Sequence, residues 1–360
     1  MTEPPTAGWS IAPDLAAATL ARLRSATRVL MPTHQNVDAD GLSSPLAISL
    51  ALKQFGVEAV PLVTDGEMPS SLRFLPGIEN VLVYGEHPLP EYDLLCLADC
   101  SDRRRLGRFY GDDPTRVDGS IPIVNIDHHI TNDLFGEINI VEPKAASASE
   151  IVADLLALWG TELTLDIAQC LLAGIYGDTL GLRTPATTSR TLRTSADLVD
   201  AGANPAVIVD HLFRLKSRST VCLWRRVLSN VQWTGSLIWT EVSPRILSDC
   251  GAVPSEAEGL VNFLAGTEGS RASAILYASD GGWRVSMRSL DEDVDVAAIA
   301  SVFGGGGHPR AAGCQITGVD GDKQRFLETT ARLSALDTGQ EGDGLSQLRL
   351  ARSEISGQLG

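Results

Sequence analysis

The chain has 360 residues, a hydrophobic fraction of 44% and a formal net charge of −16. This length is enough for two domains, and the hydrophobic fraction is enough to form buried cores. The acidic charge argues against a protein that follows a long nucleic acid, because contacts to many phosphates normally require a basic surface.

In the first half of the chain, apolar segments typical of strands alternate with segments of helical periodicity. The expected strands are Arg28–Thr33, Val57–Thr64, Asp93–Asp99 and Ile121–Ile126, and the expected helices are Pro13–Thr27, Ser43–Phe55, Ser147–Trp159 and Thr164–Gly177. This alternation predicts an α/β domain with a parallel sheet flanked by helices. In such sheets the functional residues gather at the carboxyl ends of the strands.

A second, smaller α/β domain is expected after a helical connector. Its predicted strands are Ser236–Val242, Ser273–Ala278, Trp283–Ser289 and Cys314–Thr317, and its predicted helices are Glu256–Leu264, Val294–Val302 and Lys323–Leu336. The connector contains a predicted helix at Ser189–Asp200. We therefore expect domains at residues 20–181 and 231–336, a connector at 182–230, and a disordered tail at 337–360.

Cysteine spacing and the N-terminal sequence predict a cytoplasmic protein without a membrane anchor. The six cysteines, at positions 96, 100, 170, 222, 250 and 314, form no C-x-x-C pair, which favours reduced thiols. Met1–Pro5 shows no basic flank and leads into no apolar core, so no signal peptide is expected. No run approaches the roughly eighteen consecutive apolar residues of a membrane span.

Four clusters of acidic residues and histidines follow apolar segments in the first domain. They are His34 with Asp38 and Asp40, Asp99 alone, Asp127 with His128 and His129, and Asp178 alone. Each cluster alone is weak, because a single Asp in such a position is commonly a helix N-cap. Together they predict a centre for two divalent metal ions. The mixed oxygen and nitrogen donors favour Mn²⁺ over zinc or Mg²⁺, with Mg²⁺ and Co²⁺ as alternatives.

These clusters and a glycine-rich segment give the chain a clear family resemblance. The triplet Asp127-His128-His129, with the other three clusters in the same order, resembles the four metal motifs of the DHH phosphoesterases. The segment Gly304–Gly313, with Val285–Ser289 before it, resembles the associated C-terminal substrate-binding domain, DHHA1. Two positions depart from the pattern, since relatives usually have proline in place of Val37 and glycine in place of Ser43.

The resemblance implies a role for each motif residue. One metal would be held by His34, Asp38 and Asp99 and the other by Asp40, Asp99, His128 and Asp178, with Asp99 as the bridge. His129 would act as an acid or stabilise charge at the phosphate, and Asp127 would orient a histidine. The active site would lie in a cleft between the two domains.

The glycine run is predicted to bind phosphate. Without Cβ atoms, Gly305, Gly306 and Gly307 would let successive backbone amides form a concave anion nest. His308 would add a polar contact, and Arg288 would donate a forked pair of hydrogen bonds. The alternative is an ordinary flexible loop.

Within the family, the two-domain architecture resembles that of the nanoRNases. It implies hydrolysis of oligoribonucleotides of two to five nucleotides, and of linear dinucleotides such as pApA, to mononucleotides. It also implies 3′-phosphatase activity on pAp (adenosine 3′,5′-bisphosphate), activity on cyclic di-AMP, and a homodimer. Two alternatives stay open at this point: a pAp-specific phosphomonoesterase, and a catalytically silent nucleotide sensor.

Overall fold

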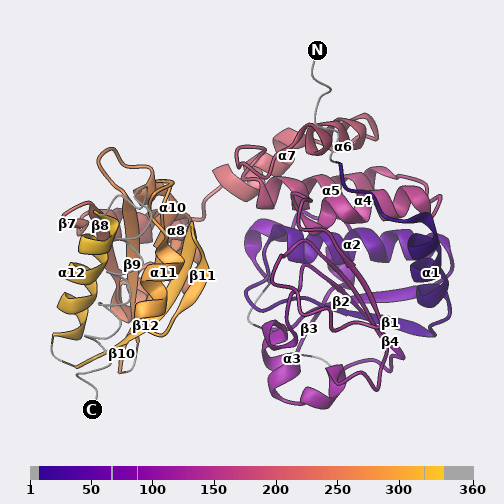
Figure 1. Cartoon of the computed structure of the whole chain (residues 1–360), viewed down its shortest axis with the longest axis horizontal. Helices are drawn as coiled ribbons and strands as arrows, with labels where there is room; N and C mark the ends of the chain where they lie inside the picture. Colours follow the sequence, from indigo (N-terminus) through magenta and orange to yellow (C-terminus); the bar gives the residue numbers. More distant parts are fainter. Residues whose placement is uncertain (1–7, 66–67, 87, 280, 320, 336–360) are drawn as a thin grey trace. The chain divides into compact units, whose positions relative to one another are not determined.

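The computed structural model describes residues 8–335 except 66–67, 87, 280 and 320. It divides into two compact units, Met1–Leu215 and Lys216–Gly360 (Figure 1). The expected connector, residues 182–230, is shared between them, and the expected tail, 337–360, lies outside the described residues. Within the described part, no helix has both the length and the apolar character needed to cross a bilayer.

The first unit contains the parallel sheet that the sequence predicts. Its strands, in spatial order, are β3 (Leu82–Val83), β2 (Glu58–Val63), β1 (Arg28–Pro32), β4 (Leu94–Ala98), β5 (Ile123–Asp127) and β6 (Ile138–Val141). Every neighbouring pair is parallel. From β1 the chain adds β2 and β3 on one side, and then β4, β5 and β6 on the other side, so the strand order reverses between β1 and β4. Sheets of α/β proteins bind ligands in the crevice at such a reversal.

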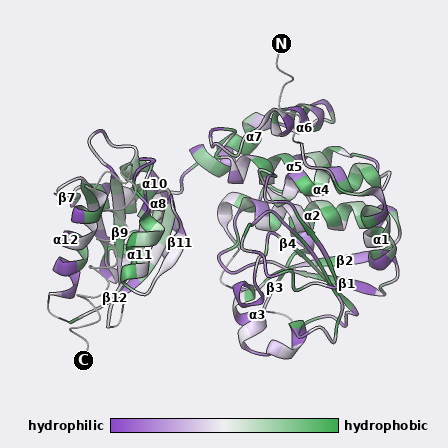
Figure 2. Ribbon diagram, viewed as in Figure 1, coloured by the Kyte–Doolittle hydropathy of each residue, from purple (hydrophilic) through white to green (hydrophobic). Residues whose placement is uncertain are grey.

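Both faces of this sheet are buried, which explains why its strands are almost continuously apolar. Val29 and Met31 point into the core beneath one set of helices, and Leu30 points into the core on the opposite face. The first face is covered by α1 (Pro13–Arg24), α2 (Ala39–Gln54), α4 (Ala148–Leu158) and α5 (Leu165–Asp178). The second face is covered by η3 (Arg103–Leu106), α3 (Gly107–Gly111) and η4 (Pro114–Val117). Figure 2 shows the hydrophobic colouring of the central strands and of the helices above them.

Helix α2 begins at Ala39, four residues before the predicted start at Ser43. The earlier start follows from an N-cap, because a carboxylate oxygen of Asp38 accepts a hydrogen bond from the Gly41 amide at 3.0 Å. The residues just before the predicted start therefore form the first helical turn, and Asp40 lies within it.

Helices α6 (Ser189–Asp200) and α7 (Pro205–Val209) and the π-helical turn η5 (Asp210–Arg214) complete the first unit.

The second unit is built on a mixed sheet. The second unit has strands in the order β11 (Gly306–His308), β12 (Ala311–Thr317), β10 (Gly282–Arg288), β9 (Ala272–Ser279), β8 (Leu237–Val242) and β7 (Gln232–Thr234). Only β8 and β9 run parallel among these strands of the described chain. Helices α11 (Val296–Val302) and α12 (Asp322–Ser334) pack on one face, and α8 (Arg218–Leu228), α9 (Pro244–Cys250) and α10 (Glu258–Ala265) on the other.

The expectation of reduced thiols is wrong for one pair of cysteines. Cys222 in α8 and Cys250 at the end of α9 form a disulfide, with Cα atoms 5.6 Å apart. The packing of the two helices brings these residues together, and no sequence motif marks the pair. Cys96, Cys100, Cys170 and Cys314 are free and buried.

The carboxylate of Glu256 joins the start of α8 to the loop before α10. It accepts hydrogen bonds from the hydroxyls of Ser217, Ser219 and Thr220 and from the Val253 amide. Partial burial acts to raise the pKa of Glu256, but these hydrogen bonds outweigh that effect and lower the pKa from 4.5 to about 2. The folded state therefore binds a proton at this position less readily than the unfolded chain.

Replacing Glu256 with glutamine is expected to lower the free energy of unfolding of the second unit at pH 7 by about 1 kcal/mol. The contribution of the carboxylate is fully present above the unfolded pKa of 4.5 and is lost as the pH falls toward about 2. Urea unfolding of wild type and Glu256→Gln at pH 7, 5 and 3 measures the difference in their free energies of unfolding, which should become smaller as the pH falls. Glu328→Gln, on the exposed side of α12, is the control and should show no such difference. A difference between Glu256→Gln and wild type that stays constant with pH would contradict the assignment.

Candidate metal centre

The polar residues of the first unit meet at the carboxyl ends of the central strands. His34 lies two residues beyond β1, Asp99 follows β4 directly, Asp127 ends β5, and Asp178 ends α5. Asp99 has a positive φ of 58°, which is uncommon for a residue other than glycine and is better tolerated by Asp and Asn than by most others. This conformation turns the chain at the strand end, within the cluster.

His34, Asp38 and Asp99 form one group, in which the potential ligand atoms lie within 4.8 Å of one another. His34 Nε2 lies 3.3 Å from Asp99 Oδ2 and 3.5 Å from Asp38 Oδ1. His34 Nδ1 donates a hydrogen bond of 2.8 Å to the Gln35 carbonyl. This bond fixes the tautomer and leaves the lone pair of Nε2 directed at the carboxylates, as a metal ligand requires.

A second group consists of Asp40, Asp99, His128 and Asp178, again with potential ligand atoms within 4.8 Å of one another. His128 Nε2 lies 3.1 Å from Asp178 Oδ2 and 3.3 Å from Asp99 Oδ1. Asp99 belongs to both groups. The two groups have the same members as the two ligand sets that the sequence resemblance implies.

Asp40 is held by residues that the sequence does not mark. The Ala148 and Ser149 amides, at the start of α4, donate to its two oxygens at 2.6 and 2.9 Å. The Ser44 hydroxyl donates to Asp40 Oδ1 at 3.1 Å and contacts the Ser149 hydroxyl. These amides belong to the N-terminus of a helix, where a carboxylate is favoured. Asp40 is fully buried, and this support allows its charge to remain there.

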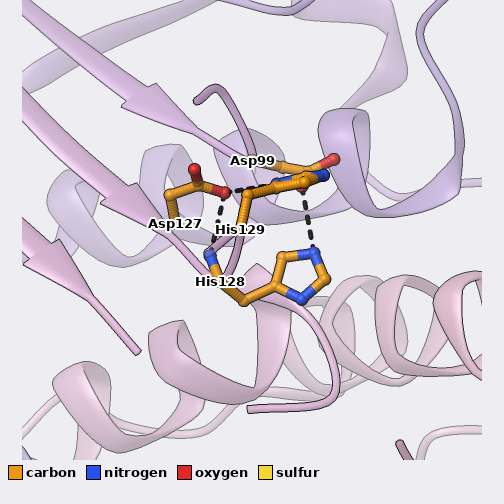
Figure 3. Close-up of side chains that lie close together, drawn as sticks. All are labelled: Asp99, Asp127, His128 and His129. Atoms are coloured by element: carbon orange, nitrogen blue, oxygen red, sulfur yellow. Dashed lines mark hydrogen bonds and ion pairs between the residues drawn. The ribbon is translucent and has the colours of Figure 1, made fainter. Parts of the chain in front are cut away.

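Asp127 organises a third part of the site (Figure 3). Its Oδ1 accepts hydrogen bonds of 2.8 Å from the His128 amide and from His129 Nδ1. Its Oδ2 accepts a bond of 2.6 Å from the side-chain amide of Asn132, a residue that sequence reasoning missed. Asp127 therefore fixes the tautomer of His129 and leaves His129 Nε2 directed away from the carboxylate.

The clustered negative charge of the centre favours the binding of cations. Burial raises the pKa of Asp40 to about 6, and the neighbouring Asp99 carboxylate adds to the rise. Burial, with the Asp40 carboxylate nearby, also raises the pKa of Asp178. Burial acts to lower the pKa of His128, but the Asp178 and Asp99 carboxylates beside its Nε2 outweigh this and raise the pKa to about 12. The carboxylates thus draw protons onto themselves and the histidines, and divalent ions would satisfy the same charge.

Three ligand atoms show that the residues fit such ions. His34 Nε2, His128 Nε2 and Asp99 Oδ1 are buried and have no hydrogen-bond partner within the described part of the chain. Buried polar atoms without a partner are costly, and a bound ion at these positions removes that cost. The donor set, carboxylate oxygens with imidazole nitrogens, suits a divalent metal.

The second unit has a hollow of about 550 Å³ on its sheet. Arg284, Ser286 and Arg288 of β10 line it, together with Gly304–Gly306 and residues of β12. Of the predicted substrate-binding residues, Arg288, Gly305 and Gly306 line the hollow, whereas Gly307 and His308 are not among its lining residues.

The prediction of a free amide nest is wrong for the first glycines of the run. The Gly304 and Gly305 amides donate to the Ser301 and Ala300 carbonyls at the end of α11. The next residues pair with β12 as strand β11. Glycine is needed here because strands approach closely, since a Cβ on Gly307 would lie 2.7 Å from the Ala312 Cα.

Two family descriptions match the chain. Residues 28–175 match "DHH family, N-terminal domain", and residues 243–334 match "DHHA1 domain". A bifunctional oligoribonuclease and PAP phosphatase NrnA from Thermus thermophilus is 35% identical over 83% of this chain and 88% of its own length. The chain belongs to the DHH family. Proteins of this family are hydrolases of phosphoester bonds that use divalent metals.

More distant proteins agree with this membership. A bifunctional oligoribonuclease and PAP phosphatase NrnA from Bacillus subtilis is 26% identical over 80% of this DHH-family chain and 89% of its own length. The crystal structure of an exopolyphosphatase-related protein from Bacteroides fragilis has a TM-score of 0.80 and 21% identity, covering 89% of this chain and 96% of its own. At that identity the likeness supports the fold alone.

Proposed function

We propose that this protein hydrolyses oligoribonucleotides of a few nucleotides, and linear dinucleotides such as pApA, to nucleoside monophosphates. The same site would remove the 3′-phosphate of pAp. The observation that carries the proposal is the cluster around Asp99, which joins two groups of carboxylates and imidazoles at the carboxyl ends of the central strands. The Thermus thermophilus and Bacillus subtilis relatives carry the names of both activities, which supports the same substrates here.

Two divalent ions, with Mn²⁺ as the preferred metal, would be held by the two groups that share Asp99. His34, Asp38 and Asp99 would hold one ion, and Asp40, Asp99, His128 and Asp178 the other. When bound, such ions lower the pKa of the water that attacks phosphorus and neutralise the phosphoryl oxygens. The mixture of carboxylates and imidazoles is the chemical basis for preferring Mn²⁺.

The other residues of the site would position the substrate and move a proton. Asp127 holds His129 with its Nδ1 protonated, so Nε2 is the nitrogen available to the phosphate. With a proton on Nε2, His129 would act as the general acid for the leaving oxygen or would stabilise its charge. Arg288, Gly306, Gly307 and His308 would bind the rest of the nucleotide. Gly305, whose amide is bonded to the Ala300 carbonyl, would contribute only by the absence of a side chain.

In this proposal, residues 20–181 carry the hydrolysis and residues 231–336 bind the substrate, with 182–230 as the connector. A homodimer is part of the same proposal, and light scattering measures it directly.

Product analysis is the first test of the proposal. Purified protein with Mn²⁺ is offered pApA, pAp, cyclic di-AMP and pyrophosphate separately, and products are resolved by chromatography. AMP from pApA and from pAp, with pyrophosphate intact, is the expected result. Cleavage of pAp without pApA would replace the proposal with a phosphomonoesterase. Failure on all four substrates, with metal bound, would favour a nucleotide sensor.

A further inference from the structure

Arg105 lies beside the proposed catalytic histidine, and no motif of the sequence analysis includes it. It belongs to η3, the 3₁₀ turn that follows the strand end carrying Asp99. One guanidinium nitrogen, Nη1, lies 3.4 Å from His129 Nε2. Because His129 Nδ1 is committed to Asp127, it is the free lone pair of Nε2 that faces the positive charge.

Arg105 differs from Arg104, Arg108 and Arg116 in having no carboxylate partner among the described residues. Arg104 pairs with Asp102, Arg108 with Asp112, and Arg116 with Asp113. No carboxylate within the described ranges lies at ion-pair distance from Arg105, and its guanidinium is only half-buried. The contact with His129 is longer than a good hydrogen bond and occupies at most one of five N–H donors. The remaining donors have no hydrogen-bond partner among the described residues and form a cationic fork at the edge of the centre.

The backbone of the turn that carries Arg105 is held in place by its neighbours. The Arg105 carbonyl accepts a hydrogen bond of 2.6 Å from the Gln35 amide, which ties the turn to the loop that carries His34. The next residue but one, Gly107, has a positive φ of 53°, and a Cβ there would lie 3.1 Å from the Gln35 Cβ. The turn is therefore packed closely against the His34 loop, and the backbone position of Arg105 follows from contacts that need no substrate.

The geometry points to Arg105 as a phosphate-binding residue that holds a non-bridging oxygen of the phosphoryl group under attack, next to His129. A planar guanidinium suits this task, because it presents parallel N–H donors to two oxygens of one phosphate. The acidic cluster on the other side would carry the metal ions, so the phosphoryl group would meet positive charge on both sides. This inference rests on the proposed function, since it assigns a residue to the same reaction.

The test compares Arg105→Ala, Arg105→Lys and the control Arg104→Ala in the full chain with Mn²⁺ and pApA. Arg105→Ala should lower kcat/KM by about a hundredfold, as the loss of one charge-stabilising donor does in other enzymes. Arg105→Lys should recover only part, because an ammonium cannot fork onto two oxygens. Arg104→Ala, which removes an exposed partner of Asp102, should stay within about twofold of wild type.

Chemical rescue separates phosphate binding from a structural role. Guanidinium at millimolar concentration should restore part of the activity of Arg105→Ala and leave wild type and Arg104→Ala unchanged. Thermal unfolding should be the same in all four proteins. An Arg105→Ala protein that retains wild-type kcat/KM, or one that loses activity and is not rescued, overturns the inference. If wild type itself fails to cleave pApA, the proposed function has failed instead, so the two failures are distinguishable.

Discussion

Replacing Asp99 with asparagine should lower the rate of pApA hydrolysis by at least about a hundredfold while the fold stays intact. Asp99 is the residue that both candidate metal groups share, so its negative charge serves both ions. Asparagine is the appropriate substitution because it is nearly isosteric and tolerates the positive φ of 58° at this position. Alanine would add backbone strain to the loss of the ligand and confuse the two effects.

Steady-state kinetics with Mn²⁺ and metal analysis of the purified protein measure this effect together. Asp99→Asn should bind less metal and should unfold at nearly the same temperature as wild type once both are metal-free. Asp112→Asn is a matched control, because Asp112 is an exposed carboxylate of the same unit that pairs only with Arg108 and Tyr84 among the described residues. Activity of Asp99→Asn within tenfold of wild type would remove Asp99 from the centre.

Gly174→Ala is expected to have a second large effect, a loss of stability. Helix propensity alone would predict the opposite, a gain of about 1 kcal/mol in the free energy of unfolding. Gly174 lies inside α5, where a Cβ would overlap the Ser149 hydroxyl and lie 2.6 Å from Asp40 Oδ1. The clash falls on the residues that fix Asp40 at the start of α4. We expect a net loss of about 1–3 kcal/mol in the free energy of unfolding, as for other overpacked cores.

The same substitution should also weaken metal binding, because the Asp40 carboxylate must shift. Urea unfolding of the metal-free protein measures the first effect, and Mn²⁺ titration measures the second. Gly111→Ala serves as the control, since a Cβ at Gly111 meets no atom within 4 Å. A Gly174→Ala protein as stable as wild type would show that α5 can move away from Asp40 without cost.

The sequence predicts which acidic residues and histidines lie together in the first unit because the signals for them are local. An apolar strand followed at once by an acid or a histidine is visible at Asp99 and at Asp127, and parallel strands must bring such ends to one edge. The groups around Asp40 are not visible in this way. Its partners, Ala148 and Ser149, are small residues 108 and 109 positions away, and only the packing of α4 brings them near.

Arg105 and the glycine run show two other limits of the sequence. Three arginines stand in a row at 103–105, and only the geometry of the turn η3 decides which one faces His129. In the glycine run, composition predicts free amides, but the end of α11 and the pairing of β11 use several of them. Short edge strands such as β3 and β7 also escape prediction, because two or three residues carry no clear period.

The candidate ligands are spread from His34 to Asp178, so they come together only when most of the first unit has folded. An ion that binds this assembled set and not the unfolded chain adds its binding free energy to the stability of the fold. The supply of divalent metal in the cell would then govern the survival of the protein as well as its activity. A chain made under metal starvation would open more often and meet proteases more often. Abundance of the enzyme would therefore follow the metal it needs, without a dedicated regulator.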